Sequence, residues 1–462
     1  MFRPAIVFFI VAALVAACTT PPMGSEAGSS IVLYEGARLI AGDGSAPIEA
    51  SAFLVERGTI TSVGRQGAVT PPAGATRVDL AGKTVMPALI STHVHPGFQK
   101  GLTYSAQNLT RENIIADLNR ALYFGVAAVM SQGIEQGEVT YQIRSDQEAG
   151  RLGGARLLIA GRGIGAPNAG PGAAAYAGIV YEVTTEAEIR QAVRELAAKK
   201  VNAIKIWVDD RGGRAPRLSP ALFRAGIDEG HKHGLKVGAH VFYHADAVDL
   251  ANAGVDSFAH LVRDKVMDDA LVASVLKHNV YIMPNLGGGE RSQYMKPPAW
   301  MDEPYLLGML KDTVAPAVVQ RMRDAFGRQE PTAAERSRQT YATLQRSLAK
   351  LNAAGARIIL GCDTGLPDHF FGYAEQRELE QMTAAGMTPA QVIVAATSRS
   401  AEYLGLSNAG SLAPGKSADF LVLDANPLDD IRNTRRIAGI YIKGAAVDRA
   451  ALRASLMKSV SN

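Results

Sequence analysis

The chain has 462 residues, too long for one small core but suited to a large barrel with an accessory domain. Hydrophobic residues make up 47% of it and charged residues 20%, an ordinary globular composition that argues against a disordered chain. The formal charge of +4 is small for this length, and no dense Lys/Arg stripe with interleaved aromatic residues occurs, so nucleic-acid binding is not expected.

The N-terminal segment has the features of an export signal. Arg3 precedes an almost unbroken apolar run from Ala5 to Val15, which is too short to span a bilayer comfortably and ends in small residues. Because Cys18 follows these small residues, residues 1–18 resemble a bacterial lipoprotein signal, in which the cysteine is acylated. A plain signal peptide cut nearby is the alternative. We therefore expect an exported bacterial protein, periplasmic or held at the outer membrane, which contacts the membrane through its lipid anchor alone.

The segments that follow change from a tether to β-structure. Residues 19–30 are small, polar and rich in Pro and Gly, which is typical of a flexible tether. Short apolar runs separated by Gly-bearing turns predict strands over residues 31–86. A second β-rich segment spans residues 406–450, so we expect the two chain ends to pair into one small β-sandwich. Residues 451–462 are expected to form a C-terminal tail.

Between residues 87 and 405, strand patterns alternate with longer helical ones. This alternation predicts an α/β fold of the (β/α)8 TIM-barrel type. The alternative, an open doubly wound sheet, would need a Gly-rich phosphate loop after an early strand, and no convincing one occurs. The first predicted strand ends at residue 95, and the others lie near residues 126–131, 155–160, 203–208, 236–242, 255–260, 280–286 and 357–363.

Two long loops of this region are expected to shape a pocket. Residues 161–177, after the third strand, are mostly Gly, Ala and Pro. Residues 287–338, after the seventh strand, are rich in Met, Tyr, Trp and Pro.

Polar side chains stand at the carboxyl ends of the predicted strands, where barrels of this type carry their chemistry. His93 and His95 are two residues apart on a strand and therefore point to the same side, as two ligands of one metal ion must. Ordinary strand histidines are the alternative. A second pair, His231 and His233, lies at a predicted helix end, where cations merely complement the last carbonyls. The other strand-end residues are Lys205, His240, His260 and Asp363.

Lys205 is predicted to face the barrel axis, because its neighbours in the strand alternate between inside and outside. An ammonium group there is costly unless it has a partner or loses its charge. A snorkelling or salt-bridged lysine is one explanation. The other is that CO2 converts the amine to a carbamate, an anionic oxygen ligand that can bridge two metal ions.

Together these motifs resemble the amidohydrolase superfamily, in the group of imidazolonepropionase-like proteins and metal-dependent prolidase-type peptidases. The resemblance covers nearly all of the chain after the export signal and tether. It rests on the His93-Val94-His95 strand and on residues 203–206, 237–240, 253–260, 361–365 and 410–420.

The resemblance implies a binuclear metal site. One ion would be bound by His93, His95, the Lys205 carbamate and Asp363, and the second by the carbamate, His240 and His260. Imidazole and oxygen ligands suit zinc, with manganese, iron or cobalt as alternatives. The mechanism that follows is hydrolysis of a C–N bond in a small-molecule amide, peptide-like or cyclic amide substrate by a metal-bridging hydroxide. Asp363 would act as general base and then as general acid.

Some segments differ from the family pattern. Ser91 and residues 86–88 stand where the family often has Asp and Leu-Pro-Gly, and residues 208–214 are also unusual. Residues 169–172 replace the Gly-Gly-His of peptidase-like members, which puts a peptidase-type substrate in doubt. Four residues at the pocket mouth are predicted to contact the substrate, although each could instead be a solvated loop residue. They are Tyr243, His244, Arg263 and His369.

Two other functions stay open at this point. A mononuclear deaminase or cyclic-amidine hydrolase usually needs no lysine on the fourth strand, so Lys205 argues against it. A non-enzymatic surface lipoprotein that binds ligands with the same barrel would be expected to lose metal ligands, yet every expected position is filled. A homo-oligomer is compatible with each of these functions.

Overall fold

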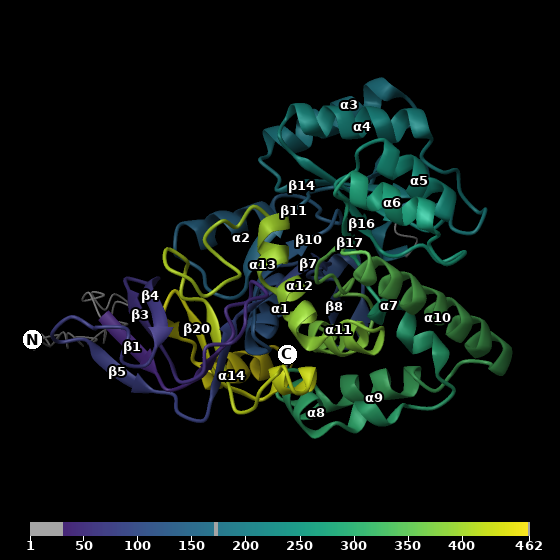
Figure 1. Ribbon diagram of the computed structural model, residues 1–462. Coiled ribbons are helices and arrows are strands. Elements are labelled where there is room, and N and C mark those ends of the chain that lie inside the picture. Colours follow the sequence, from purple (N-terminus) through teal and green to yellow (C-terminus); the bar gives the residue numbers. More distant parts are fainter. Residues whose placement is uncertain (1–30, 171–173, 461–462) are drawn as a thin grey trace, which may run out of the picture.

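The computed structural model describes residues 31–170 and 174–460, and its fold is α/β (Figure 1). The predicted export signal, Cys18 and the tether lie outside the described residues. Among the residues that are described, no helix combines the length and apolar character that a membrane span requires.

The central strands are parallel and fall into two sheets, with the orders β11-β10-β7 and β13-β12-β14-β15-β16-β17-β18. The burial of these strands explains the apolar runs in the sequence, because both faces of a parallel sheet are covered. The strands are β7 (Leu89–Val94), β10 (Val126–Ser131), β11 (Arg156–Ile159), β12 (Ile164–Gly165), β13 (Tyr181–Glu182), β14 (Ala203–Val208), β15 (Lys236–Val241), β16 (Ser257–Ala259), β17 (Tyr281–Met283) and β18 (Arg357–Ile358).

Helices between these strands bury their apolar sides against them in one shared hydrophobic core. Local signals begin several helices: Thr185 and Glu188 form a reciprocal capping box, and Pro220 follows the capping residue Ser219. The helices are α1 (Arg111–Tyr123), α2 (Val139–Glu148), α3 (Glu186–Ala198), α4 (Pro220–Lys232), α5 (His244–Asn252), α6 (Asp269–Lys277), α10 (Pro331–Ala353), α11 (Tyr373–Ala384), α12 (Pro389–Ala396) and α13 (Ser398–Tyr403).

Backbone hydrogen bonds connect the two parallel sheets to each other. The Thr92 N–H donates to the Leu360 carbonyl at 2.8 Å, so the chain that follows β18 lies beside β7. On the other side, the Gly163 N–H donates to the Gly133 carbonyl at 2.7 Å. The predicted α/β class is confirmed, whereas closure of these strands into one continuous barrel stays a prediction.

Strands from both chain ends form two further sheets beside the parallel strands, visible in purple and yellow in Figure 1. Residues 84–87 pair with residues 420–423, which joins the two ends of the chain in one sheet. One hydrophobic cluster connects the sheets, with the ring of Tyr34 edge-on to Phe420 at 5.1 Å. That they form a separate β-sandwich domain stays a prediction. The first sheet contains β4 (Thr59–Arg65), β3 (Ser51–Glu56), β1 (Ile31–Glu35) and β5 (Thr76–Asp79), and the second contains β2 (Arg38–Leu39), β6 (Thr84–Pro87), β19 (Phe420–Leu423), β20 (Ile437–Ile442) and β21 (Ala445–Ala446).

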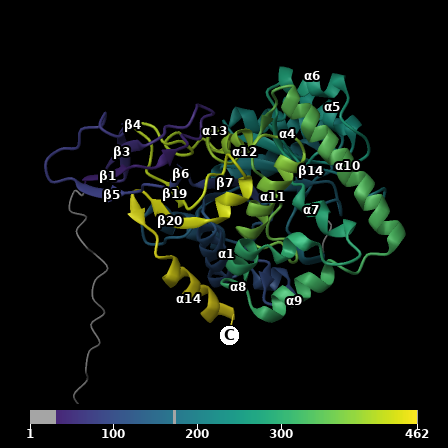
Figure 2. The same cartoon turned by 60° about the horizontal axis from the view of Figure 1, so that its bottom comes forward.

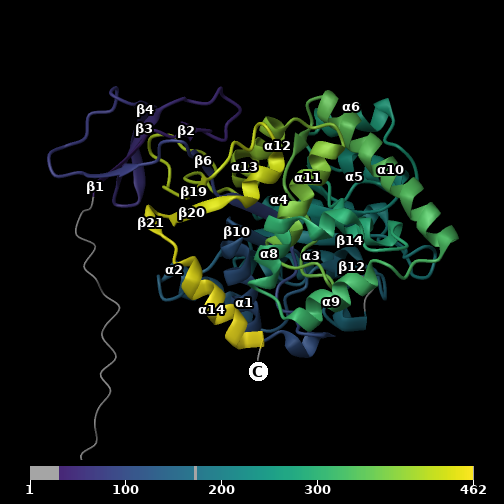
Figure 3. The ribbon, with the colours of Figure 1, turned by 90° about the horizontal axis from the view of Figure 1, so that it is seen from below.

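The chain end that we expected to be a tail is helical as far as the structure describes it. Helix α14 (Arg449–Val460) lies beside α1, as Figure 2 and Figure 3 show. The guanidinium of Arg449 lies over the Tyr123 ring, 4.3 Å from its centre, and donates a hydrogen bond to the Tyr123 carbonyl at 3.3 Å.

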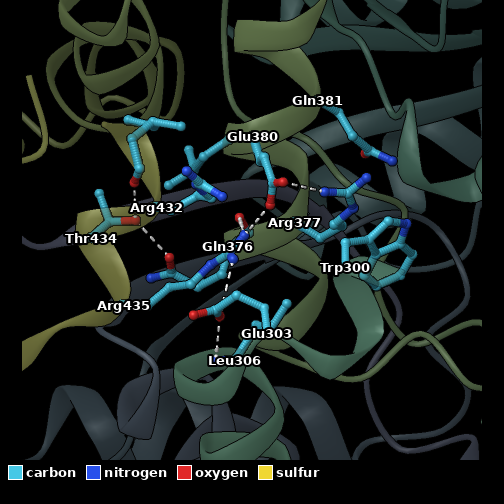
Figure 4. A network of polar contacts seen from close by, with 12 residues as sticks. Trp300, Glu303, Leu306, Gln376, Arg377, Glu380, Gln381, Arg432, Thr434 and Arg435 are labelled. Atoms are coloured by element: carbon cyan, nitrogen blue, oxygen red, sulfur yellow. Dashed lines mark hydrogen bonds and ion pairs between the residues drawn. The ribbon is translucent and has the colours of Figure 1, made fainter. Parts of the chain in front are cut away.

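The long segment after β17 is mostly helical, and buried ion pairs tie it to α11 and to the C-terminal region (Figure 4). Arg435, almost fully buried, pairs with Glu303 at 3.3 Å and also with Glu380. These contacts fix the position of the segment relative to α11 and the C-terminal region. Its elements are α7 (Gly287–Glu290), η3 (Arg291–Gln293), η4 (Ala299–Asp302), α8 (Pro304–Lys311) and α9 (Pro316–Ala325); shorter elements elsewhere are β8 (Gln99–Lys100), β9 (Thr103–Tyr104), η1 (Ala106–Asn108), η2 (Ala174–Tyr176) and η5 (Ile431–Arg435).

Candidate metal centre

Three predicted metal ligands converge at the carboxyl ends of the parallel strands. His93 lies near the end of β7, His260 follows β16 and Asp363 follows β18, and each places a ligand atom within 4.8 Å of the other two. Carboxyl ends of parallel strands meet at one edge of the fold, so residues far apart in the sequence come together there. Both histidines are buried.

The Asp363 carboxylate lies among imidazoles. Its Oδ1 is 2.9 Å from His95 Nε2 and 3.4 Å from His93 Nε2, and its Oδ2 is 3.9 Å from His260 Nε2. Although burial opposes ionisation, the neighbouring imidazoles, His93 foremost, hold the pKa of Asp363 well below its usual range. Burial also lowers the pKa of His93 and His260, which favours the neutral form of the imidazole, the form that binds a metal ion.

The backbone is strained at two of these residues. His260 has a φ of 101° and Asp363 a φ of 56°, in the left-handed region that non-glycine residues seldom adopt. Such strain costs about 1–3 kcal/mol per residue and is concentrated at functional sites. Gly365 permits the turn after Asp363, since a Cβ there would lie 2.1 Å from the His95 carbonyl oxygen.

Lys205 lies inside the fold, as its place in β14 predicts. Its side chain is 1% exposed, and in the part of the chain that the structure describes its Nζ has no hydrogen-bond partner. Burial lowers the pKa of Lys205 to about 7. The stem passes close to Gly133, where a Cβ would lie 2.8 Å from Lys205 Cγ.

His240 is oriented differently from the other candidate ligands. Its ring is 4.6 Å from that of His260, but its Nε2 is 3.0 Å from Asp209 Oδ2. Although burial opposes ionisation, this hydrogen bond holds the pKa of Asp209 below its ordinary value. The contact leaves Nδ1 of His240 as the nitrogen available to a metal ion.

Sequence reasoning missed three residues near this centre: Asp209, Asn285 and Tyr176. Asp209 lies in the run that differs from the family pattern, which was the one available signal. Asn285 follows β17, one of the strands for which no ligand was predicted, and its Nδ2 is 2.9 Å from His93 Nδ1 and 3.1 Å from His260 Nδ1. Tyr176 lies in the Gly/Ala-rich loop, with its ring 6.3 Å from the ring of His95.

Tyr176 belongs to an aromatic group on the His95 side of the centre. Its ring is edge-on to Phe98 at 4.8 Å, and its hydroxyl is hydrogen-bonded to the Tyr104 hydroxyl. Trp207 belongs to the same hydrophobic cluster. This side of the centre is therefore apolar with two hydroxyl groups.

The four predicted substrate contacts occupy different surroundings. Arg263 Nη2 is 3.2 Å from His260 Nδ1, and His369 Nδ1 is 3.2 Å from the Asp363 carbonyl oxygen. These two residues thus touch candidate metal ligands. The Tyr243 hydroxyl donates to Asp210 at 2.9 Å, and His244 Nε2 is 3.1 Å from Asp268. Their roles in substrate binding stay predictions.

Ser91, which differs from the family pattern, takes part in the support of the centre. Its hydroxyl donates to Glu375 Oε1 at 3.0 Å, and the Thr364 hydroxyl donates to the same oxygen at 2.8 Å. Glu375 therefore ties β7 to the segment that carries Asp363. Burial raises the pKa of Glu375.

Residues 84–447 match the Amidohydrolase family, and the chain belongs to that family. Membership indicates a hydrolase that acts on C–N bonds. Members generally bind metal ions, for which His93, His260 and Asp363 form a candidate site here.

Individual relatives agree with this placement. The enamidase of Eubacterium barkeri is 23% identical over 406 residues, 87% of this chain and 89% of the relative. An uncharacterised protein of Mycobacterium tuberculosis strain H37Rv is 26% identical over 361 residues, 77% of this chain and 83% of the relative. The solved structure of a candidate prolidase from Bifidobacterium longum is similar with a TM-score of 0.71 and 27% identity, over 93% of this chain and 99% of that one.

Proposed function

We propose that the protein is a metal-dependent amidohydrolase that cleaves an amide or peptide-like C–N bond at two divalent ions, within a closed (β/α)8 barrel flanked by a β-sandwich. The observation that carries the proposal is the convergence of His93, His95 and His260 on the ionised Asp363. Neutral imidazoles with a carboxylate are a donor set that zinc binds well, and manganese, iron or cobalt also accept it.

Lys205 supports the binuclear form of the site. A buried amine that has no hydrogen-bond partner among the described residues, with a pKa of about 7, is available in its neutral form near pH 7. A neutral amine adds to CO2 and releases one proton, which leaves an anionic carbamate. We propose that this carbamate holds both ions, together with His93, His95 and Asp363 on one side and with His240 and His260 on the other.

Bound ions supply a Lewis acid for the substrate carbonyl and lower the pKa of a water molecule toward neutrality. The residues of the chain supply the proton transfers. Asp363 is ionised, so one of its carboxylate oxygens accepts a proton from the attacking water and returns it to the leaving nitrogen. Its left-handed backbone and its contact with His95 hold the carboxylate toward the centre.

Two features beside the candidate ligands suggest how a substrate is held. Arg263 contacts His260 on one side, and Tyr176 lies beside His95 on the other. We propose that an anionic group of the substrate pairs with Arg263 and that an apolar group packs against Tyr176 and Phe98.

A hydrolysis screen tests this function. Metal-loaded protein is assayed with N-acyl amino acids, dipeptides, aryl amides, ureas and lactams, while bound metal is measured by mass spectrometry. We expect turnover of one class, its loss on chelation and its return with Zn²⁺, and an Asp363→Asn variant that is inactive. A chain that binds both ions but hydrolyses no class would instead favour a binding protein, and a chain that binds no metal would refute the proposal.

We also propose that the protein is exported and anchored in the outer membrane through an acylated Cys18, on the strength of the apolar run before it. Fractionation of bacteria that express the full chain should place it with membranes. The Cys18→Ser variant should lose the lipid label and leave the membrane fraction. Wild-type protein found in the cytoplasm would contradict export.

A further inference from the structure

Asn285 lies between two of the candidate ligands. Its side chain is buried, and its Nδ2 faces the Nδ1 atoms of both His93 and His260, at 2.9 Å and 3.1 Å. Its Oδ1 is also buried, and among the described residues it has no hydrogen-bond partner. A buried carbonyl oxygen without a partner is costly and calls for an explanation.

A metal-bound histidine would place a different demand on the Asn285 amide. When Nδ1 accepts a hydrogen bond, the proton of a neutral imidazole lies on Nε2, which here points toward Asp363. An imidazole that binds a metal through Nε2 must instead carry its proton on Nδ1, and that N–H needs an acceptor. The amide nitrogen of Asn285 cannot serve as one.

A half-turn of the Asn285 amide gives both Nδ1–H groups an acceptor and moves the amide nitrogen to the present place of Oδ1. Amide oxygen and nitrogen have nearly the same shape, so the turn exchanges them with little change in packing. The Oδ1 then faces both Nδ1–H groups and has two lone pairs to accept them. Gly361 makes room for the amide, since a Cβ there would lie 2.9 Å from the present position of Oδ1.

We propose that Asn285 is a positioning residue for both metal ions: its Oδ1 accepts the Nδ1–H of His93 and of His260 and so directs Nε2 of both imidazoles toward the centre. This inference rests on the proposed function. In that scheme His93 is a ligand of one ion and His260 is a ligand of the other. The Asn285 amide would therefore affect the affinity of both ion sites.

A consequence concerns Arg263. Its guanidinium has donors only, and its Nη2 lies 3.2 Å from the same His260 Nδ1. A proton on Nδ1 removes the acceptor for this contact. With that proton in place, Arg263 would lose its contact with His260, and its guanidinium would be available to an anionic group of the substrate.

Three variants test the role of Asn285. Asn285→Leu has a similar shape without an acceptor, whereas Asn285→Asp keeps the acceptor. Gln376→Met is the matched control, because Gln376 is another buried amide with two polar partners, Thr434 and the Phe124 carbonyl, in the network of Figure 4. Zn²⁺ affinity is measured by competition with a chromophoric chelator, and Co²⁺-loaded protein is compared by its visible spectrum.

We expect Asn285→Leu to bind both ions roughly 10–100-fold more weakly, as loss of a hydrogen bond to a ligating histidine does. Asn285→Asp should bind at least as tightly as the wild type. Gln376→Met should unfold at a lower temperature but retain wild-type Zn²⁺ affinity and an unchanged Co²⁺ spectrum.

Wild-type affinity in Asn285→Leu, or a loss in folded Asn285→Asp, would overturn the role of Asn285. The Asp variant keeps the test decisive if the Leu variant does not fold. A wild-type chain that binds no Zn²⁺ would refute the proposed function itself, so the two failures are distinguishable.

Discussion

Gly133 makes room for Lys205 beneath the candidate metal centre. A Cβ at this position would lie 2.8 Å from Lys205 Cγ and also from the Trp207 ring. Gly133→Ala should therefore displace the lysine stem, at a cost of about 1–3 kcal/mol, and reduce both metal content and turnover. Metal content per chain and thermal unfolding measure the two effects.

Gly137→Ala is the matched control for this change. Both glycines have positive φ, so alanine strains the backbone at either one, but a Cβ at Gly137 meets nothing within 4 Å. We expect the control to lose some stability and keep its metal. Equal metal content in both variants would show that Lys205 does not depend on this space.

Asp209 offers a test of how the second ion is bound. It faces His240 alone among the candidate ligands, whereas Asn285 faces two. Asp209→Leu should therefore lower the affinity for one ion roughly 10–100-fold and leave the affinity for the other unchanged. Asn285→Leu, by contrast, should lower the affinity for both ions. Stepwise Zn²⁺ titration resolves the two events.

Asp210→Asn serves as the control, because Asp210 contacts Tyr243 and not a candidate ligand. It should leave both titration steps in place. If the Zn²⁺ titration curve of Asp209→Leu were the same as that of the wild type, this role for Asp209 would be excluded.

At the scale of elements, α7 is a glycine-rich turn held over the centre by a buried ion pair. Glu290, which ends α7, pairs with Arg377 of α11 at 2.6 Å (Arg377 is shown in Figure 4). Three glycines precede Glu290, and a Cβ on Gly288 would lie 3.8 Å from Asp363 Oδ2. The backbone thus approaches the site closely, and the ion pair fixes a turn that has no side chains of its own to pack.

Glu290→Gln should release this turn. Breaking one side of a buried pair costs about 3 kcal/mol, so we expect a lower unfolding temperature together with reduced kcat/KM. Metal content should stay at the wild-type level, because Glu290 touches none of the ligands. Glu335→Gln, which removes the exposed partner of Arg338, should change neither quantity. Full activity in folded Glu290→Gln would show that α7 does not need this anchor.

At the scale of the whole molecule, the sequence can predict which polar residues lie at the carboxyl ends of the strands. His93, Lys205 and Asp363 were predicted as ligands because the carboxyl ends of parallel strands meet at one edge, where short motifs that are far apart in the sequence come together. Asn285 and Tyr176 could not be found in this way. An amide after an apolar run is ordinary in any protein, and a tyrosine in a Gly/Ala loop has no periodicity that would show which way it faces.

The hydrogen bonding of the parallel strands into sheets could not be predicted from the sequence either. The alternation of strands and helices predicted the α/β class but not the division of the parallel strands into two hydrogen-bonded sheets. That division depends on β-bridges and irregular backbone, such as the residues between β11 and β12, where apolar patterning carries no information on hydrogen bonding.

The pH dependence of folding tests the buried imidazoles. Burial holds the pKa of His93 and of His260 well below the ordinary value of 6.5. Below pH 6.5 the unfolded metal-free chain therefore binds more protons at these residues than the folded chain does, and the free energy of unfolding falls as the pH falls. Burial raises the pKa of Glu135 to about 7 and that of Glu378 to about 8, and both groups act in the opposite direction.

Because the histidine and glutamate contributions oppose one another, we compare the pH dependence of the free energy of unfolding between a variant and the wild type. Urea unfolding is measured between pH 5 and pH 7 in the presence of a chelator. His260→Gln should lose up to about 1.4 kcal/mol of pH dependence per pH unit relative to the wild type, since it removes one proton-binding difference. If His260→Gln kept the wild-type pH dependence, His260 would titrate alike in the folded and unfolded chains, and the buried neutral imidazole that the metal centre requires would be absent.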